Sequence, residues 1–276
     1  MKSNIKTGLH LLWFVPAFAA LLFGCKKNSI TTPDQSLSLF GGGGTTLSYF
    51  VMDDPNSSFK IGLGVTKASN VDRVINFTIS SPSGAQEGAQ YTIDTKSVTI
   101  PAGKVVDSVT LKGIFDGIPV GVKDTLIFKI NGGDVDPLQG VDQLTVVMQK
   151  YCSVDLNQFS GTYNNQDYFG GAPDGNPYTV TITPGTATGS KGYILVSGLW
   201  GFSIPLVKVE LDWSDPSNFT TYVPTALWFV HPTYGQATIR PSGYGTFSSC
   251  DNSFTINYET TVAAGSFGRE TSVISK

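Results

Sequence analysis

Few residues of this 276-residue chain have the chemistry that catalysis usually needs. The chain has two histidines, and His10 lies in an N-terminal apolar run, so only His231 would remain if that run were cleaved off. A Ser-His-Asp or Cys-His triad would have to use His231, and no Gly-x-Ser-x-Gly motif accompanies it. One histidine also leaves a zinc site without enough nitrogen or sulfur ligands. We therefore expect neither a triad nor a metal centre.

Carboxylates are the remaining candidates for catalysis. Two carboxylates about 5 to 9 Å apart suffice for glycoside hydrolysis, and the chain has 21 acidic residues. Glu210, Asp212 and Asp215 cluster beside Trp213 and form the most enzyme-like group. Glu210 and Asp212 are two residues apart, so in a strand they would share one face, where two solvated carboxylates are ordinary. We expect no catalytic residue and no cofactor.

Aromatic residues favour binding over catalysis. Trp200, Trp213 and Tyr222 stand in polar or glycine-containing surroundings after the middle of the chain. Such side chains can offer flat apolar faces with polar edges to sugar rings or to a protein partner. The alternative is that they belong to a core, as we expect for Trp228 in its apolar run. We name Trp200, Trp213 and Tyr222 as candidate ligand-binding residues.

The chain has three cysteines: Cys25, Cys152 and Cys250. If Cys25 carries a lipid, Cys152 and Cys250 remain as an even pair, which in an oxidising compartment indicates a disulfide. Such a bridge would close a loop of about 100 residues and stabilise the fold by a few kcal/mol. Two separate free thiols are the alternative.

The N-terminal segment explains the third cysteine. Lys2 and Lys6 precede an apolar run from Leu11 to Phe23, and Gly24 stands directly before Cys25. This order of charged, apolar and small residues is typical of a secretory signal, and it resembles the lipobox of bacterial lipoproteins. The resemblance implies a signal peptide over residues 1–24 and acylation of Cys25, for example by palmitate. An ordinary cleaved signal and a retained anchor are the alternatives, although the run is shorter than the roughly 20 residues of a membrane span.

Composition limits the partners. The formal net charge is −3 and becomes more negative once Lys2 and Lys6 are removed, which argues against nucleic acid or an anionic membrane surface as the main partner. Charged residues make up only 14% of the chain, below the usual quarter. The membrane partner that we expect is the lipid anchor itself, in the outer membrane, at either its periplasmic face or the cell surface.

The apolar pattern alternates with period two nearly everywhere after residue 46, and glycine, proline and aspartate clusters separate the runs. No stretch shows the i, i+3, i+4, i+7 spacing of a long helix. We predict an all-β protein: a flexible tether over residues 25–45, an immunoglobulin-like antiparallel sandwich over 46–149, and a second small β-barrel or sandwich over 150–276.

The first of these units resembles a Calx-beta-like domain. The resemblance rests on Gly88–Ile93, on Val98–Lys104 with its Pro-Ala-Gly turn, and on Thr125–Ile130. Such domains recur in lipoproteins of Bacteroidetes, and calcium-binding members use acidic loop residues. Here Gln90 stands at the position of the family's aspartate. In the acidic loop of residues 115–124 only Asp116 and Asp124 carry a carboxylate, and the neighbouring Lys123 ammonium would repel the ion, so we expect no calcium.

These observations predict a non-catalytic, envelope-anchored lipoprotein that binds a glycan or a protein partner. A purely structural envelope protein is the alternative from another class. A glycoside-acting enzyme is the third.

Overall fold

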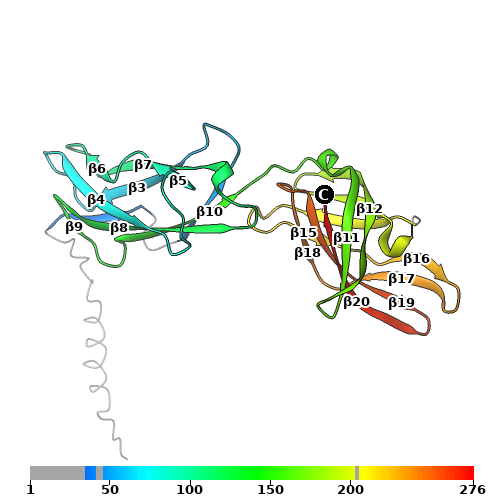
Figure 1. Cartoon of the computed structure of the whole chain (residues 1–276). Helices are drawn as coiled ribbons and strands as arrows, with labels where there is room; N and C mark the ends of the chain where they lie inside the picture. Colours follow the sequence, from blue (N-terminus) through cyan, green and yellow to red (C-terminus); the bar gives the residue numbers. More distant parts are fainter. Residues whose placement is uncertain (1–34, 42–45, 203–204) are drawn as a thin grey trace, which may run out of the picture. The chain divides into compact units, whose positions relative to one another are not determined.

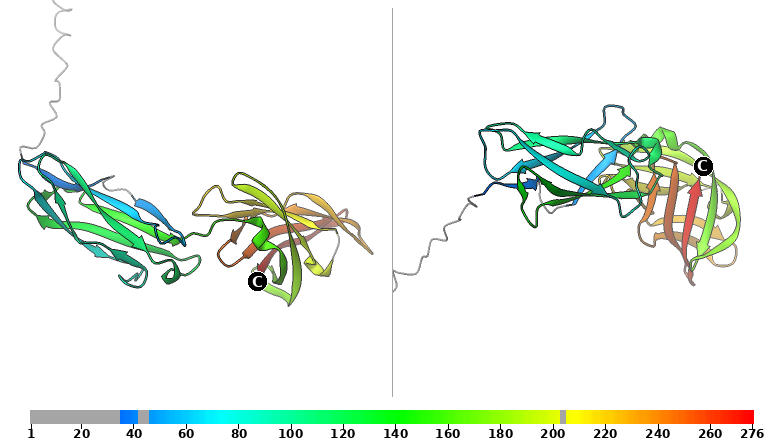
Figure 2. Two further views of the ribbon diagram at one scale, coloured as in Figure 1. Left: turned by 90° about the horizontal axis from the view of Figure 1, so that it is seen from above. Right: turned by 60° about the vertical axis from the view of Figure 1, so that its left-hand side comes forward.

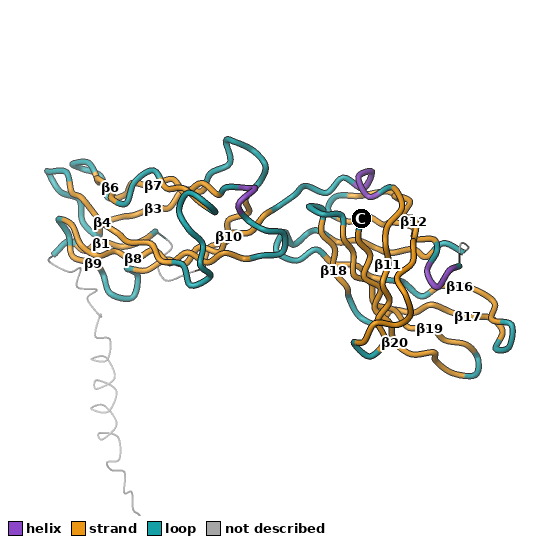
Figure 3. Tube along the Cα trace, viewed as in Figure 1, coloured by secondary structure: helices purple, strands orange, loops and turns teal. Residues whose placement is uncertain are grey.

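The computed structural model describes residues 35–41, 46–202 and 205–276. The predicted signal peptide and Cys25 therefore lie outside the described residues. The described chain is all-β, as predicted: Figure 3 shows strands joined by loops, with three short 3-10 turns among the described residues. These turns are η2 (Phe115–Gly117), η3 (Leu156–Phe159) and η4 (Leu199–Gly201).

Two five-stranded sheets form the first half. One sheet has the order β5-β7-β3-β1-β9 and the other β2-β10-β8-β4-β6. Most pairings are antiparallel, as predicted, for example β10 with β8 and β3 with β7. Two pairings, β1 with β9 and β2 with β10, are parallel. The strands are β1 (Leu37–Phe40), β2 (Thr46–Val51), β3 (Phe59–Val65), β4 (Arg73–Ser80), β5 (Tyr91–Ile93), β6 (Ser97–Ile100), β7 (Val106–Gly113), β8 (Lys123–Gly133), β9 (Asp136–Pro137) and β10 (Gln143–Lys150).

Alternation of side chains builds the core of this half. In β3, Ile61, Leu63 and Val65 are buried, while the residues between them are more exposed. Residues of both sheets contribute to one apolar cluster, in which Phe40, Phe77 and Phe128 pack edge-on or tilted. Period-two alternation is what a two-layer sandwich needs, because each sheet can bury only one face.

The predicted tether extends too far along the chain. Residues Leu37–Phe40 form β1, and Phe40 is fully buried in the core of the sandwich. The tether prediction followed the glycine run of residues 41–44, but this run comes after the first strand and not before it. The missed signal is that three of the four residues Leu37–Phe40 are apolar, although this pattern does not reveal that Ser38 and Phe40 are the buried pair.

The second half closes into a ring of strands (Figures 1 and 2). The order β11-β12-β13-β14-β15-β18-β19-β20 returns to β11 through the pairing of β20 with β11, and β16–β17 extends the sheet beside β19. The strands are β11 (Gly161–Phe169), β12 (Ala172–Thr188), β13 (Lys191–Ser197), β14 (Val207–Asp212), β15 (Thr220–Tyr222), β16 (Ala226–His231), β17 (Gly235–Pro241), β18 (Gly245–Ser248), β19 (Ser253–Val262) and β20 (Gly265–Ser275).

Eight strands give a barrel whose interior is just wide enough to be filled by side chains. Val180, Ile194, Val209 and Ile256 are at most 1% exposed and belong to a second apolar cluster that shares no residue with the first. Phe159 of η3 adds to this core, with its ring centroid 5.0 Å from that of Phe254.

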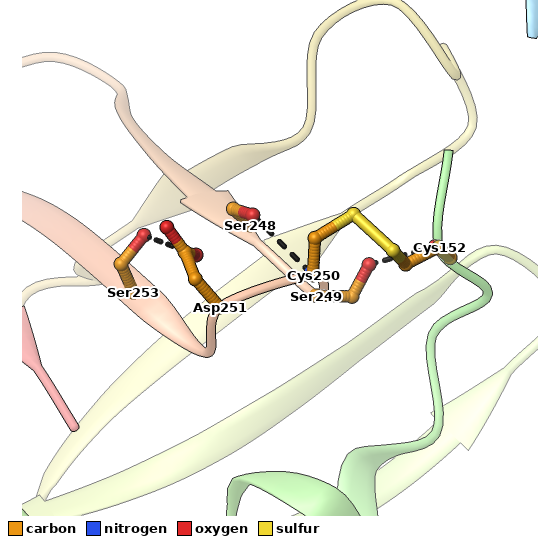
Figure 4. The surroundings of a disulfide bond; sticks show 6 residues. All are labelled: Cys152, Ser248, Ser249, Cys250, Asp251 and Ser253. Atoms are coloured by element: carbon orange, nitrogen blue, oxygen red, sulfur yellow. Dashed lines mark hydrogen bonds between the residues drawn. A yellow bond between two sulfur atoms is a disulfide. The ribbon is translucent and has the colours of Figure 1, made fainter. Parts of the chain in front are cut away.

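A disulfide joins the start of this half to its later strands. Cys152 lies before η3, and Cys250 follows β18, with an S–S distance of 2.17 Å (Figure 4). Next to the bridge, the Ser249 hydroxyl donates a hydrogen bond to the carbonyl of Cys152 at 2.7 Å. The disulfide therefore holds the segment between β10 and η3, which contains Cys152, against the barrel.

We predict that the double variant Cys152→Ala/Cys250→Ala lowers the free energy of unfolding of the second half by roughly 4 kcal/mol, because the 98-residue loop gains entropy in the unfolded chain. Trp200, Trp213 and Trp228 all belong to or pack against this core. In a Trp13→Phe background, urea unfolding followed by tryptophan fluorescence therefore reports on the second half alone. An unchanged urea midpoint would show that the disulfide does not stabilise this half.

Candidate functional site

A groove of about 490 Å³ lies on the outer face of the second half. It crosses β12, β13, β14 and β15, and Tyr244, just before β18, completes its wall. Three tyrosines, several threonines and two pairs of opposite charges line it: Thr186, Thr188, Lys191, Gly192, Tyr193, Lys208, Glu210, Leu211, Asp212, Thr220, Tyr222 and Tyr244.

Strand register brings three of these side chains into one row. Tyr193 pairs with Glu210, and Glu210 pairs with Tyr222, across β13, β14 and β15. Their neighbours along the strands, such as Ile194 and Val209, are fully buried. Because side chains alternate between the faces of a strand, burial of the apolar neighbours points the row outward.

Two tyrosines form an aromatic wall. The ring centroids of Tyr222 and Tyr244 are 5.4 Å apart with the planes tilted by 40°, and Tyr244 is 70% exposed. The Asn257 side chain donates a hydrogen bond to the Tyr244 carbonyl at 2.8 Å. The next residue must be a glycine, since a Cβ on Gly245 would lie 1.9 Å from the Thr255 carbonyl oxygen. The sequence thus fixes the backbone that carries Tyr244.

Each acid of the groove has a cationic partner. Lys191 pairs with Asp212 and Lys208 with Glu210, both at 2.8 Å. Hydrogen bonds from Lys191 and from Ser214 lower the pKa of Asp212 to about 2. Glu210 and Asp212 do share one strand face, as predicted. A glycosidase pairs one protonated carboxyl group with one ionised carboxylate. Asp212 is held ionised, and Glu210 is ion-paired with Lys208.

Trp200 and Trp213 lie outside the groove, while Tyr222 lies within it. Both tryptophans are half-buried and pack against the barrel core. Trp213 has its ring centroid 6.5 Å from that of Phe247, and Trp200 lies 5.2 Å from Trp228. The core alternative thus describes the two tryptophans better. The turn-like sequences around them suggest exposure, but their large rings pack against the apolar cluster instead.

Sequence reasoning missed Tyr193 and Tyr244. Tyr193 alternates with Ile194 at the start of a predicted strand, so the period-two pattern could have placed it outward. Lys208 lies over its ring at 5.0 Å. Tyr244 follows Gly243 in a polar turn, and nothing local in the sequence indicates that it meets Tyr222.

His231 has a local structural role. Its Nδ1 accepts hydrogen bonds from the backbone N–H groups of Thr233 and Tyr234, at 3.1 and 3.2 Å, and so closes the turn between β16 and β17. No group of three His, Cys, Asp or Glu suited to a metal ion occurs among the described residues.

The acidic loop of the first half is also built into the fold. Asp116 is exposed, whereas Asp124 is 5% exposed and accepts a hydrogen bond from the Ser83 hydroxyl at 3.1 Å. Gln90 accepts from the backbone N–H of Gln86 at 2.8 Å and donates to the Gly117 carbonyl at 3.3 Å. Gln90 therefore joins two loops.

Two carboxylates are buried inside the barrel. Asp167 and Glu270 are 5% and 6% exposed. Asp167 accepts hydrogen bonds from Asn165 at 2.8 Å, from Tyr178 at 2.6 Å and from Ser272. Glu270 accepts from the Trp200 indole N–H at 2.5 Å and from Tyr258 at 3.3 Å. Hydrogen-bond donors surround both acids, which is what a buried carboxylate requires.

Burial raises the pKa of Glu270 to about 7, and the nearby Asp167 adds to the rise, while the Trp200 hydrogen bond opposes it. The folded protein therefore binds this proton more tightly than the unfolded chain does. Between about pH 4.5, the ordinary value, and pH 7, the free energy of unfolding must fall as the pH rises.

We predict that this loss amounts to roughly 3 kcal/mol and that Glu270→Gln removes it, because glutamine keeps the acceptor for Trp200 without a titrating group. Urea unfolding between pH 4 and 8, followed by tryptophan fluorescence in a Trp13→Phe background, measures the slope. The control Glu259→Gln, on the outer face of the adjacent strand, keeps the wild-type slope. An identical slope in Glu270→Gln would assign the pH dependence to another group.

No helix among the described residues is long and apolar enough to span a membrane. No protein-family model matches the chain, and no curated protein matches it either.

Several solved structures are distantly similar. A Bacteroides ovatus protein of unknown function is 14% identical over 87% of this chain and 89% of its own, with a TM-score of 0.36. The apo form of the Calx CBD1 domain is 12% identical over 42% of this chain and 98% of its own, with a TM-score of 0.35. A candidate carbohydrate binding protein from Bacteroides ovatus is 11% identical over 84% of this chain and 69% of its own, also with a TM-score of 0.35. These similarities are too distant to carry an argument about function.

Proposed function

We propose that this chain is a non-catalytic binding protein whose groove at Tyr222 and Tyr244 takes a glycan. The observation that carries the proposal is the pairing of two tyrosine rings beside hydroxyl and charged groups in one open groove. Sugar rings have apolar faces for aromatic contact and hydroxyl edges for hydrogen bonds. Aromatic platforms ringed by polar groups suit both.

The charges of the groove favour a neutral sugar. Two lysines and two acids are already paired within it, so the groove has no net charge. Lys208 covers the ring of Tyr193, which leaves Tyr222 and Tyr244 as the free aromatic faces. Thr186, Thr188 and Thr220 supply hydroxyl groups that donate and accept hydrogen bonds.

We predict that Tyr222→Ala and Tyr244→Ala each weaken glycan binding about fivefold or more, because each removes an aromatic contact worth roughly 1 kcal/mol. A glycan array with neutral oligosaccharides selects the ligand, and titration calorimetry measures the affinities. The matched control is Tyr234→Ala, which removes a 48% exposed tyrosine outside the groove. Equal affinities in all four proteins, or no glycan bound by the wild type, would reject the proposal.

The proposal includes an anchor at the cell envelope. The lipobox resemblance around Cys25 supports it, and two or more acyl chains give stable membrane attachment. On this account the second half would present its groove to glycans while the N-terminus holds the protein in the outer membrane.

We predict that wild-type protein expressed in a bacterial host incorporates a palmitate analogue and fractionates with membranes, while Cys25→Ala does neither. Cys152→Ala/Cys250→Ala serves as the control, since it removes the other two cysteines and should still be labelled. Label in the Cys25→Ala protein would place the lipid elsewhere.

A further inference from the structure

A second groove, of about 430 Å³, lies on the outer face of the barrel around β19, β20 and the turn from β11 to β12. Tyr168 pairs with Thr271, and Thr271 pairs with Asn257, so these three side chains form a row across three adjacent strands. With strands about 4.8 Å apart, the row spans roughly 10 Å. That length fits a single sugar ring with its substituents.

Hydrogen bonds fix the floor of this groove. The Thr271 hydroxyl donates to Asn257 Oδ1 at 2.7 Å, and Asn257 Nδ2 donates to the Tyr244 carbonyl at 2.8 Å. The backbone N–H of Ser242 donates to the Asn257 carbonyl at 3.4 Å. The floor is therefore preorganised, and a ligand need not order it on binding.

Arg269 gives this groove a positive charge. Glu270 also borders the groove, but its carboxylate is turned into the barrel, where Trp200 and Tyr258 donate to it. Arg269 is exposed and makes no ion pair with any described residue.

The nearest carboxylate in the register is Glu259, opposite Arg269 on β19. Glu259 does not line the groove, and its Oε1 accepts a hydrogen bond from Ser266 at 2.6 Å. On its other side Glu259 faces Arg240 of β17, so one acid lies between two arginines. Arg240, Glu259 and Arg269 together carry one excess positive charge, even though the whole chain is negatively charged.

We propose that this second groove binds an acidic sugar, with the oxyanion on Arg269 and the sugar ring against Tyr168. Arginine presents two parallel N–H donors that match a carboxylate or sulfate. The ring of Tyr168 and the Ser242 hydroxyl then contact the rest of the ligand. The site differs in lining residues and in charge from the neutral groove at Tyr222 and Tyr244, and the hydrogen bond from Asn257 to the Tyr244 carbonyl is the contact described between the two.

The test uses saturation-transfer NMR and calorimetry at low salt with glucuronate, glucose and inorganic sulfate as probes. We expect wild type to bind glucuronate at least tenfold more tightly than glucose at this groove, and more tightly than sulfate. Arg269→Gln should weaken glucuronate binding about tenfold, as expected for the loss of a charge-assisted bidentate contact. Tyr168→Ala should weaken glucuronate binding while leaving sulfate binding unchanged.

Two control variants separate this site from other causes. Arg240→Gln removes an exposed arginine that pairs with Glu259 on the side away from Arg269 and does not line the groove. This variant should keep most of the affinity for glucuronate. Tyr222→Ala damages the first groove and should leave glucuronate binding intact. Equal losses in both arginine variants would mean diffuse attraction and overturn the proposal. So would glucuronate binding that is absent in the wild type, insensitive to Tyr168→Ala, or lost in Tyr222→Ala.

Discussion

Closure of the second half into an eight-stranded ring is the constraint on which the rest of its structure depends. Pairing of β20 with both β19 and β11 leaves no open edge within the ring, so every strand must put one face inside and one outside. Inward positions are occupied by Val180, Ile194, Val209 and similar residues. The outward positions between them are then free for tyrosines, threonines and charges. Both grooves are consequences of this alternation, because each is a row of outward side chains at matching register.

The interior of the barrel is not uniformly apolar, because it contains the carboxyl groups of Asp167 and Glu270, and burying them is unfavourable without hydrogen-bond donors. Asp167 and Glu270 lie among donors from four strands and from Trp200 of η4, and each donor is needed because a buried charge without partners is expensive. Trp200 itself has φ of 53°, which is unusual for a residue other than glycine. Its backbone N–H donates a hydrogen bond to the Tyr178 hydroxyl, and its indole N–H donates to Glu270. This buried cluster joins the η4 turn to the barrel.

Much of the fold follows from the sequence. Period-two alternation predicted the all-β class, and the strand from Arg73 to Ser80 shows why: its buried residues are the ones that the alternation pointed inward. The predicted tether is too long because the glycine run of residues 41–44 resembles a boundary, although three of the four residues Leu37–Phe40 before it are apolar. Local pattern does not reveal which strands pair in parallel, since β1–β9 and β2–β10 are contacts between distant segments.

The site was harder to predict. The polar surroundings of Tyr222 predict an exposed ring, but its partner Tyr244 is brought to it by the β15–β18 pairing and by the close backbone approach at Gly245. The surroundings of Trp200 and Trp213 are of the same kind as those of Tyr222, yet their rings pack against the core. Sequence context alone does not separate an aromatic ring that covers a core from one that lines a groove, because both occur next to glycine and polar residues.

The central claim is that the groove at Tyr222 and Tyr244 binds a glycan. Its most direct test is an NMR titration with a neutral oligosaccharide that the protein binds, in which the assigned ring signals of the tyrosines are followed. The account predicts saturable shifts of the Tyr222 and Tyr244 rings, with the buried Tyr163 ring unchanged. A bound oligosaccharide that leaves the Tyr222 and Tyr244 signals in place, and moves those of other tyrosines instead, would contradict it.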